Sequence, residues 1–529
     1  MKIKYSPPSY FSQPKIVQFN TAHGNHSQYM RSFTDDKLVK QGHGRSGIRW
    51  VTTILALVLL VAFLSACGGE STPTFTVTPE ATTTPIPTPT PQGISPDQNL
   101  AEIIAAANEG DTIILGPGVF TLAQGIEINK NLTLLGAGYD QTMIESSAPG
   151  EDFSAAVMYS GSGLLSIQGI TLSYIGSDPA AVLYGKSGSI SLKDCYFSGA
   201  TLSSSGSQLG AIHLANEVVV DIVNSKIAGS MERIDQDNPD KVPGGIIIYG
   251  NARLTIEASE IFDSYLGIYA YGESEVVARN GNIHNTFSGV SLLENATATL
   301  ENNTFRDNTS IHLILFGDSS AVVTGNSFSG ISTGTGVQAH GNGNVHLEGN
   351  TFADLLSCII FTENATGDVI ANTLSSFSNI GIFVQGYASP EFDSNIIAGE
   401  NSDAIGITYE GNAAGTARGN QISNLDTGIS LSGMSAPLLE SNTIQNCTQG
   451  IFYQEESSGT ATLNTIQFGH IGILIDSPAY PTITNNTIQA YYQSIMTNPV
   501  DWIDKIPVAD NTLQDGEPDI VIVTVTPQP

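Results

Sequence analysis

Charge is scarce in this chain of 529 residues. Charged residues make up 13% of it and hydrophobic residues 40%, a balance that excludes a disordered polyelectrolyte. Basic residues are scarcer still, since 19 Lys and Arg stand against 50 Asp and Glu and give a net charge of −31. A surface of this sign repels nucleic acids and anionic lipid headgroups. We therefore expect no nucleic-acid partner.

Cysteines and long hydrophobic runs are also few. Three of the 4 cysteines, Cys195, Cys358 and Cys447, are too far apart in the repeats described below to form a disulfide, so we expect buried free thiols. The apolar run at 54–64 falls short of the ~20 residues that a membrane-spanning helix needs. In contrast, glycine is abundant, with 54 residues, which favours an all-β fold of short strands and tight turns.

The short apolar run lies within a predicted export signal. Arg45 and Arg49 precede it and Leu-Ser-Ala-Cys, ending at Cys67, follows it, which is the order typical of a secretory signal. These last four residues resemble the bacterial lipobox, whose cysteine becomes the lipid-modified first residue of the mature protein. Residues 1–66 are thus predicted to be a signal region, and Cys67 the lipidation site.

Two alternatives stay open at this end of the chain. An uncleaved membrane anchor would leave the protein on the same outer face of the cell membrane. The signal also has an unusually long segment before its apolar run, which fits a translation start at Met30 and would leave residues 1–29 untranslated.

Extended segments are predicted on both sides of the main domain. From 71 to 92, Thr and Pro supply 15 of 22 residues, a composition that forms no core and favours extended chain. We predict that residues 67–95 form a stalk. The segment 516–529 ends in a similar composition and is predicted to be a flexible tail.

The chain between 96 and 515 repeats about every 22 residues. An Asn followed two positions later by a large apolar residue recurs ten times at spacings of 22 to 25 residues, from Asn303 to Asn511. A Gly-Ile or Gly-Val pair often follows about eight residues later. Apolar and polar residues then alternate, as in 429–432, which indicates strands. Such a period predicts a repetitive solenoid.

This pattern resembles the right-handed parallel β-helix of the pectin-lyase-like superfamily, whereas the Leu-x-x-Leu-x-Leu pattern of leucine-rich repeats is absent. An amphipathic segment beginning at Leu100, followed by Glu-Gly-Asp-Thr-Ile at 109–113, resembles the N-terminal cap of such proteins. The resemblance implies an all-β, single-stranded right-handed parallel β-helix over 96–515 with an N-terminal capping helix. It implies little about function, because this fold supports many activities.

Stacking the repeats assigns roles to two kinds of residue. The recurring Asn residues should form an internal ladder, since a buried amide must be hydrogen-bonded. Arg279 and Arg418 stand between acidic residues of adjacent coils, so we expect ion pairs that leave few cations for a uronate substrate.

Catalytic motifs of the superfamily are not found in the repeats. The Asp-Asp and Gly-His-Gly of polygalacturonases occur only at 35–36 and 42–44, before the lipobox. Trp-Ile-Asp-Lys at 502–505 resembles the Trp-Ile-Asp-His of pectate lyases, but Lys replaces His. The Asp-Pro-His-Asp of alginate epimerases is absent. The sequence therefore leaves open whether the protein is an enzyme.

An outward face of the repeats is rich in aromatic residues. His213, Tyr249, Tyr269 and Tyr271 are predicted to lie close together there and to bind sugar rings as a substrate. Simple cross-strand stabilisation beneath covering loops is the alternative. The same alignment places His312 in the column of His213.

Two long insertions, at 198–210 and 228–244, precede the strands of this face. The second contains Glu232, Asp235, Asp237 and Asp240, which are candidate catalytic carboxylates. The three aspartates are also candidate ligands for Ca²⁺, the one cofactor that the sequence suggests. A solvated acidic loop is the alternative.

Two functions remain. The first is an exported, lipid-anchored, monomeric module of the cell surface that binds or displays extracellular polysaccharide. The alternative is a carbohydrate-active enzyme, a polysaccharide lyase, epimerase or glycoside hydrolase, with its site on the 228–244 loop.

Overall fold

The computed structural model describes residues 93–201, 209–229, 243–330, 332–400 and 403–515, together with the backbone of strand β47 (Ile522–Thr524). All of them belong to one compact unit, residues 86–529. Cys67, the signal region and nearly all of the predicted stalk lie outside the described residues. Among the residues described, no helix is long and apolar enough to cross a membrane.

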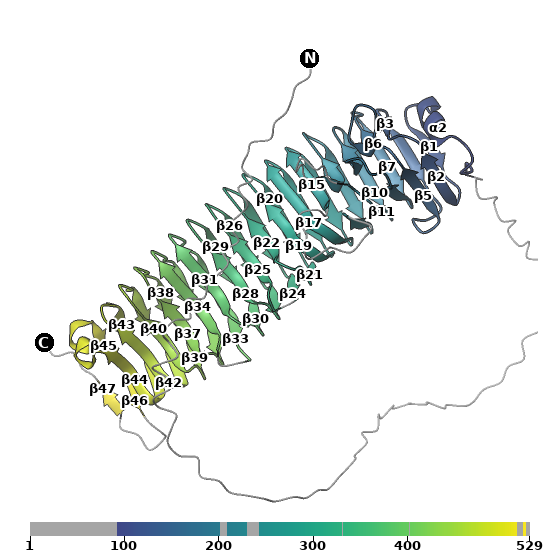
Figure 1. Ribbon diagram of the computed structural model, residues 1–529. Coiled ribbons are helices and arrows are strands. Elements are labelled where there is room, and N and C mark those ends of the chain that lie inside the picture. The colour runs from purple at the N-terminus through teal and green to yellow at the C-terminus, as the bar shows by residue number, and fades with distance from the viewer. Residues whose placement is uncertain are drawn as a thin grey trace, which may run out of the picture. The chain divides into compact units, whose positions relative to one another are not determined.

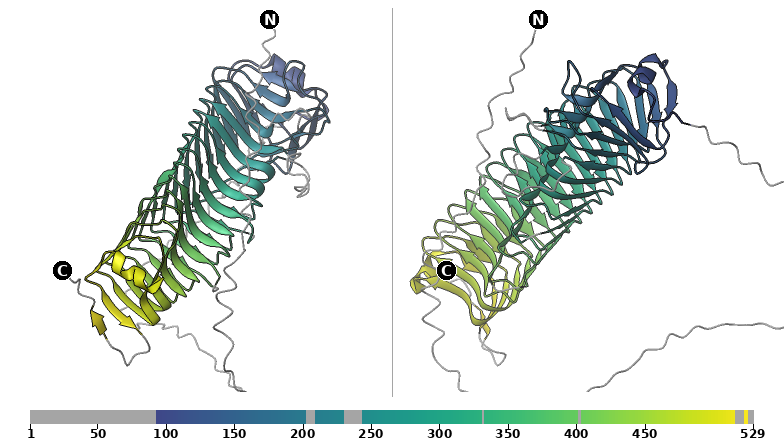
Figure 2. Two further views of the ribbon diagram at one scale, coloured as in Figure 1. Left: turned by 60° about the vertical axis from the view of Figure 1, so that its left-hand side comes forward. Right: turned by 45° about the vertical axis from the view of Figure 1, so that its right-hand side comes forward.

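This unit is a parallel β-solenoid. Its strands, from β1 (Asp111–Ile114) to β47 (Ile522–Thr524), form one sheet of 17 strands and one of 30. The coils stack along a single axis, with the first coils at one end and the last coils at the other (Figures 1 and 2). The all-β parallel solenoid predicted from the 22-residue period is confirmed. Strand β47 pairs antiparallel to β46.

Each coil is built from three strand segments. In one coil, β20 (Thr297–Glu301) lies in the 17-stranded sheet, and β21 (Thr304–Arg306) and β22 (Ile311–Leu315) lie in the other. In some coils the last two segments join into a single long strand, as in β17 (Glu260–Gly272). Alternate residues point inward, which explains the period of two that the sequence shows.

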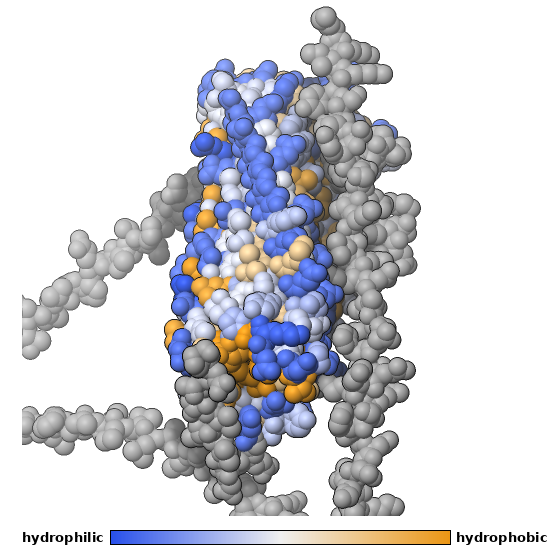
Figure 3. All heavy atoms as spheres, turned by 90° about the vertical axis from the view of Figure 1, so that its left-hand side faces the viewer, coloured by the Kyte–Doolittle hydropathy of each residue, from blue (hydrophilic) through white to orange (hydrophobic). Residues whose placement is uncertain are grey.

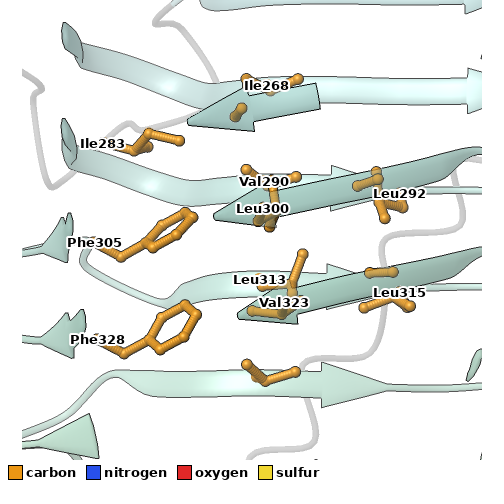
Figure 4. Close-up of a cluster of buried hydrophobic side chains, with 14 of the residues drawn as sticks. Ile268, Ile283, Val290, Leu292, Leu300, Phe305, Leu313, Leu315, Val323 and Phe328 are labelled. Atoms are coloured by element: carbon orange, nitrogen blue, oxygen red, sulfur yellow. The ribbon is translucent and has the colours of Figure 1, made fainter. Parts of the chain in front are cut away.

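The core is a set of columns that run along the solenoid axis. Phe305 and Phe328 stack with ring centroids 4.8 Å apart, and Leu300, Leu313 and Val323 project into the same interior (Figure 4). All five side chains are completely buried. Because each coil places an apolar residue over its counterpart, the core is continuous from coil to coil.

Left-handed backbone conformations mark the corners of the coils. Asn302 (φ 55°), Asn446 (φ 54°) and Gly317 (φ 71°) each represent one of three such corners. Asn, Asp and Gly tolerate this conformation, which explains why they recur at these points. Leu463 and Phe468, both with φ 58°, are bulky exceptions.

The asparagine ladder is confirmed. The Asn326 carboxamide oxygen accepts hydrogen bonds from the backbone N of Asn303 (2.8 Å) and from its Nδ2 (3.1 Å). Asn303 Nδ2 also donates to the carbonyl oxygen of Ala278 (2.8 Å). The same pattern continues to Asn511, so the side-chain amides satisfy backbone groups at one corner of each coil.

Short helices lie near both ends of the described solenoid. Helix α2 (Leu100–Ala106) contributes Leu100 and Ile104 to the core cluster. The 3₁₀ helix η2 (Val500–Lys505) places Trp502 against the same cluster, and the indole Nε1 donates to the Ala479 carbonyl oxygen (2.8 Å). Trp502, which resembles a pectate-lyase motif residue, therefore has a packing role.

Candidate functional site

Four successive coils carry a group of aromatic side chains, which we call the aromatic cluster: Tyr184, His213, Tyr249, Tyr269 and Tyr271. They lie on β9 (Ala181–Gly185), β12 (Gly210–Leu214), β15 (Gly244–Gly250) and β17. His213 is in register with Tyr184, and Tyr249 with Tyr271. The structure thus brings together the four residues predicted to bind sugar.

Sequence reasoning missed Tyr184. This residue precedes His213 by 29 positions, because the insertion at 198–210 stretches that repeat beyond its usual 22 residues. The apolar residues Ala-Val-Leu directly before Tyr184 indicate a strand of the same kind and could have identified this position.

His213 occupies the middle of the cluster. Its ring lies edge-on to Tyr184 at 5.5 Å and to Tyr249 at 5.2 Å between centroids. The hydroxyl oxygens of Tyr184 and Tyr249 are 3.2 Å apart, within hydrogen-bonding distance. Two tyrosines from coils on either side of His213 therefore meet beside it.

The other rings pack on one another. Tyr249 and Tyr271 stack with centroids 5.5 Å apart and an angle of 15° between the rings. Tyr269 leans on Tyr271 at 5.7 Å. All of these side chains are half-buried. Because Tyr249 and Tyr271 each cover one ring face of the other, the cluster offers ring edges and hydroxyl groups more than open ring faces.

Burial shifts two ionisation equilibria in the cluster. It lowers the pKa of His213 to about 4. It also raises the pKa of Tyr269 to about 12, with a further contribution from Tyr271 and from the negative charge of Glu294. Both side chains are therefore uncharged at neutral pH. Nδ1 of His213 is enclosed and has no hydrogen-bond partner among the described residues.

A polar groove adjoins the cluster on its N-terminal side. It has a volume of about 530 Å³ and includes Ser160, Lys186, Asn216 and Glu217 in its lining. Within the described ranges Lys186 forms no ion pair. The groove supplies both donors and acceptors of hydrogen bonds next to the aromatic rings.

His312 does not belong to this face, which corrects the alignment made from the sequence. Ser291 is in register with Ile314, so Ile314 occupies the column of His213. His312 is fully buried, and its Nδ1 lies 2.8 Å from Nδ2 of Asn308. The Gly-Ile or Gly-Val pair that marks this strand in other coils is absent here, and the sequence alignment is therefore two residues out of register at His312.

Both ends of the 228–244 insertion lie beside β17. The backbone N of Gly229 donates to Ser264 Oγ (2.8 Å), and that of Tyr265 donates to the Pro243 carbonyl oxygen (3.0 Å). The loop therefore leaves and returns next to the strand that carries Tyr269 and Tyr271. Its residues 230–242 lie outside the described part, and with them Glu232, Asp235, Asp237 and Asp240.

The structure confirms the predictions for the cysteines and the arginines, whereas the prediction of a Ca²⁺ site stays open. Within the described ranges no group of three or more His, Cys, Asp or Glu is placed to hold a metal ion; Ca²⁺ binding by the undescribed loop stays a prediction. The buried free thiols are confirmed for Cys195, Cys358 and Cys447. The ion pairs are confirmed too: Arg279 and Arg418 each lie 2.6 Å from a glutamate of the next coil.

Comparison with known proteins supports the fold. Residues 244–367 and 357–498 match the family described as "Right handed beta helix region". No curated protein matches the sequence significantly.

Solved structures resemble the chain at low sequence identity. The A-module of mannuronan C-5 epimerase AlgE6 from Azotobacter vinelandii is 16% identical, with 70% of this chain and 93% of that one covered and a TM-score of 0.40. The periplasmic alginate epimerase AlgG is 11% identical (71% and 84% covered, TM-score 0.34). PfbA, a surface adhesin of Streptococcus pneumoniae, is 11% identical (69% and 94% covered, TM-score 0.39). Together with the parallel stacked coils, the family match identifies the fold as a right-handed β-helix of the pectin lyase-like type.

Proposed function

We propose that this protein is an exported, lipid-anchored β-helix that binds extracellular polysaccharide at the aromatic cluster and the adjoining groove. The observation that carries the proposal is the convergence of five aromatic residues from four coils next to a polar groove. Sugars present apolar ring faces and hydroxyl groups together, and tyrosine combines an apolar ring with a polar tip.

The size of this surface suits an oligosaccharide. Coils in a parallel solenoid are about 4.8 Å apart, so the five coils from Ser160 to Tyr271 extend over roughly 20 Å. This length accommodates several sugar units along the axis. The hydroxyls of Tyr184 and Tyr249, together with Lys186 and Glu217 in the groove, would then supply hydrogen bonds along the bound chain.

The charge distribution favours an uncharged glycan over a polyuronate. Five basic residues among those described are paired with carboxylates, namely Lys226, Arg253, Arg279, Arg306 and Arg418. Among the described residues that line the groove, Lys186 is the one basic side chain, and Glu217 lies in the same groove. Repeated binding of carboxylates along a polyuronate needs more cations than this.

The proposed anchorage rests on the sequence. A lipid on Cys67 and a Thr/Pro-rich stalk would hold the solenoid at the outer face of the cell membrane. We also propose that helix α2 covers the N-terminal end of the core, since Leu100 and Ile104 are buried there and an open sheet end invites pairing with other chains. The protein would act as a monomer.

A carbohydrate-active enzyme is the second candidate, and one observation favours it. The ends of the acidic 228–244 insertion lie beside β17, so loop carboxylates could approach a sugar on the cluster. His213 is a poor general base at neutral pH, however, because its pKa of about 4 lies far below the operating pH. We therefore place binding ahead of catalysis.

The test is glycan-array binding combined with turnover assays on the full chain in detergent. Wild type should bind polysaccharide without releasing product, and Tyr271→Ala should weaken binding by about 1–2 kcal/mol through loss of the ring. Tyr271→Phe separates the contribution of the hydroxyl from that of the ring. Binding that is indifferent to Tyr271→Ala would remove the cluster from the proposal, and measurable turnover would favour the enzyme.

A further inference from the structure

A second group of aromatic side chains lies on the last coils, and it is more exposed than the aromatic cluster. Phe468, His470, Tyr491 and Tyr492, which we call the tip patch, lie on β42 (Thr465–Asp476) and β44 (Thr487–Asn498). Phe468 is 43% exposed, Tyr491 55% and Tyr492 58%. In Figure 3, hydrophobic residues gather in the lower part of the view among hydrophilic ones, and tyrosine and histidine carry the hydrophilic colours of this scale.

Phe468 has a left-handed backbone conformation at a corner where the preceding coils have small polar residues. Phe468 has φ 58°, and the residues at the same corner of the two preceding coils are Asn446 (φ 54°) and Asn424 (φ 60°). Bulky residues are rare in this region of the Ramachandran map. Phe468 therefore lowers stability at a position where Asn would be tolerated, and strain of this kind motivates a test for a role in binding.

An irregular strand pairing accompanies this strain. The register between β42 and β44 shifts on either side of Gly469, and such bulges redirect side chains at the edges of sheets. His470 stacks on Tyr492 with centroids 5.1 Å apart and an angle of 14°. The stack fixes the Tyr492 ring while more than half of the side chain stays open to solvent.

The two strands of the tip patch, β42 and β44, carry no Lys or Arg, and Lys505 of η2, a helix that contacts β44, lies over the Trp502 ring. The sequence has no Lys or Arg between Arg418 and Lys505. Asn446 precedes Phe468 by one coil, and the carbonyl of Thr448 accepts from the backbone N of Ile471 (3.0 Å), next to His470. Asp426 lies one coil further back, where the backbone N of Gln449 donates to its carbonyl oxygen (2.8 Å). Burial raises the pKa of the Asp426 carboxyl.

We infer that the tip patch is a second glycan-binding surface, with an uncharged polysaccharide as its ligand. Open aromatic rings bordered by amide and hydroxyl groups match the apolar faces and hydroxyls of sugars. The absence of Lys and Arg from β42 and β44, in a chain of net charge −31, disfavours an anionic ligand. This inference takes only the class of ligand from the proposed function. The tip patch is a separate surface, because about nine coils, or roughly 40 Å, lie between it and the aromatic cluster.

The first test is affinity electrophoresis of the full chain in detergent, through gels that contain β-glucan, mannan, xylan or polygalacturonate. At least one of the three uncharged polymers should retard wild type, and polygalacturonate should not. Tyr491→Ala and Tyr492→Ala should each weaken that retardation about tenfold in Kd. No retardation by an uncharged polymer, stronger retardation by polygalacturonate, or retardation unchanged in both variants would overturn the inference.

A matched pair of substitutions separates binding from strain. Phe468→Asn restores the residue type of the neighbouring coils, so it should raise Tm while it weakens glycan binding. Leu463→Asn is the control, because Leu463 has the same φ of 58° and is 54% exposed at a different corner. It should raise Tm and leave binding unchanged. Equal effects of the two variants on binding would contradict a specific role for Phe468.

Two further measurements identify other outcomes. Tyr271→Ala is run beside the tip variants. Loss of binding only in Tyr271→Ala would support the proposed function and overturn the role of the tip patch. Loss of binding only in the tip variants would support the tip patch and overturn binding at the aromatic cluster. Sedimentation of wild type and Tyr492→Ala should show the same mass for both. A wild-type dimer that this variant dissociates would assign the patch to a second copy of the chain instead.

Discussion

Asn442 and Asn464 are joined by two hydrogen bonds to a single oxygen atom. The carboxamide oxygen of Asn464 accepts from the backbone N of Asn442 (2.9 Å) and from its Nδ2 (2.9 Å). Asn442 Nδ2 also donates to the Ala417 carbonyl oxygen (2.8 Å). Each ladder amide therefore connects three coils, and its loss affects groups in all of them.

Substitution of Asn442 by Ala should destabilise the solenoid more than substitution of its neighbour Thr443. The first leaves fully buried polar groups unpaired, at a cost of about 1–3 kcal/mol. Thr443 is only half-buried, and Thr443→Ala should cost less than about 0.5 kcal/mol. Urea denaturation of the two variants compares them. Equal and small losses would contradict a stabilising role for the ladder.

Buried histidine should make the fold sensitive to mild acid. Burial lowers the pKa of His312 to about 4, against about 6.5 in an unfolded chain. Between these values the unfolded state binds more protons, so stability rises with pH and is lost as pH falls from 6.5 toward 4. His312 alone contributes up to about 3 kcal/mol to this dependence.

The measurement is the free energy of unfolding at pH 7, 5.5 and 4 for wild type and for His312→Asn. The variant should lose less stability on acidification than wild type, whatever its stability at pH 7. Parallel curves for the two proteins would show that His312 titrates alike in the folded and unfolded states.

The membrane form should carry a diacylglyceryl group on Cys67. Mass spectrometry of the N-terminal peptide detects the group directly. Cys67→Ala should release the protein to the medium or leave an uncleaved precursor, because the lipid is then absent. Wild-type mobility and membrane retention in that variant would argue for a different anchor.

The acidic loop can be tested without knowledge of its conformation. In the triple variant Asp235→Ala, Asp237→Ala and Asp240→Ala, retained glycan binding with lost turnover indicates acid/base chemistry. Two results together indicate metal ligation. Chelation abolishes glycan binding by wild type and added Ca²⁺ restores it, whereas added Ca²⁺ does not restore binding by the triple variant. Unchanged binding and turnover would assign these residues to a solvated loop.

The sequence predicts the fold well because the ladder and the core demand the same residue type at the same place in every coil. A buried Asn or Phe has few acceptable replacements, so Asn303 and Phe305 reveal their coil directly. Outward residues have no such constraint. Tyr184 was missed because a long insertion separates it from His213, and His312 was misplaced because the Gly-Ile or Gly-Val pair that marks this strand in other coils is absent from its coil.

The tip patch escaped prediction for a related reason. Periodicity assigns outward positions only where strand register is regular, and the bulge at Gly469 interrupts it. Nor does a one-dimensional pattern distinguish an open ring from a covered one: Tyr271 and Tyr492 are both tyrosines in outward positions, yet Tyr271 is half-buried and Tyr492 is 58% exposed.

The antiparallel pairing of β47 with β46 has a consequence for self-association. A stack of parallel coils ends in a strand whose free backbone groups could accept the first coil of another molecule, and repetition of that contact would produce a filament. A strand running in the opposite direction occupies those groups in part and cannot be continued by a parallel coil. The C-terminal edge thus discourages polymerisation even though each coil is built to stack on the next.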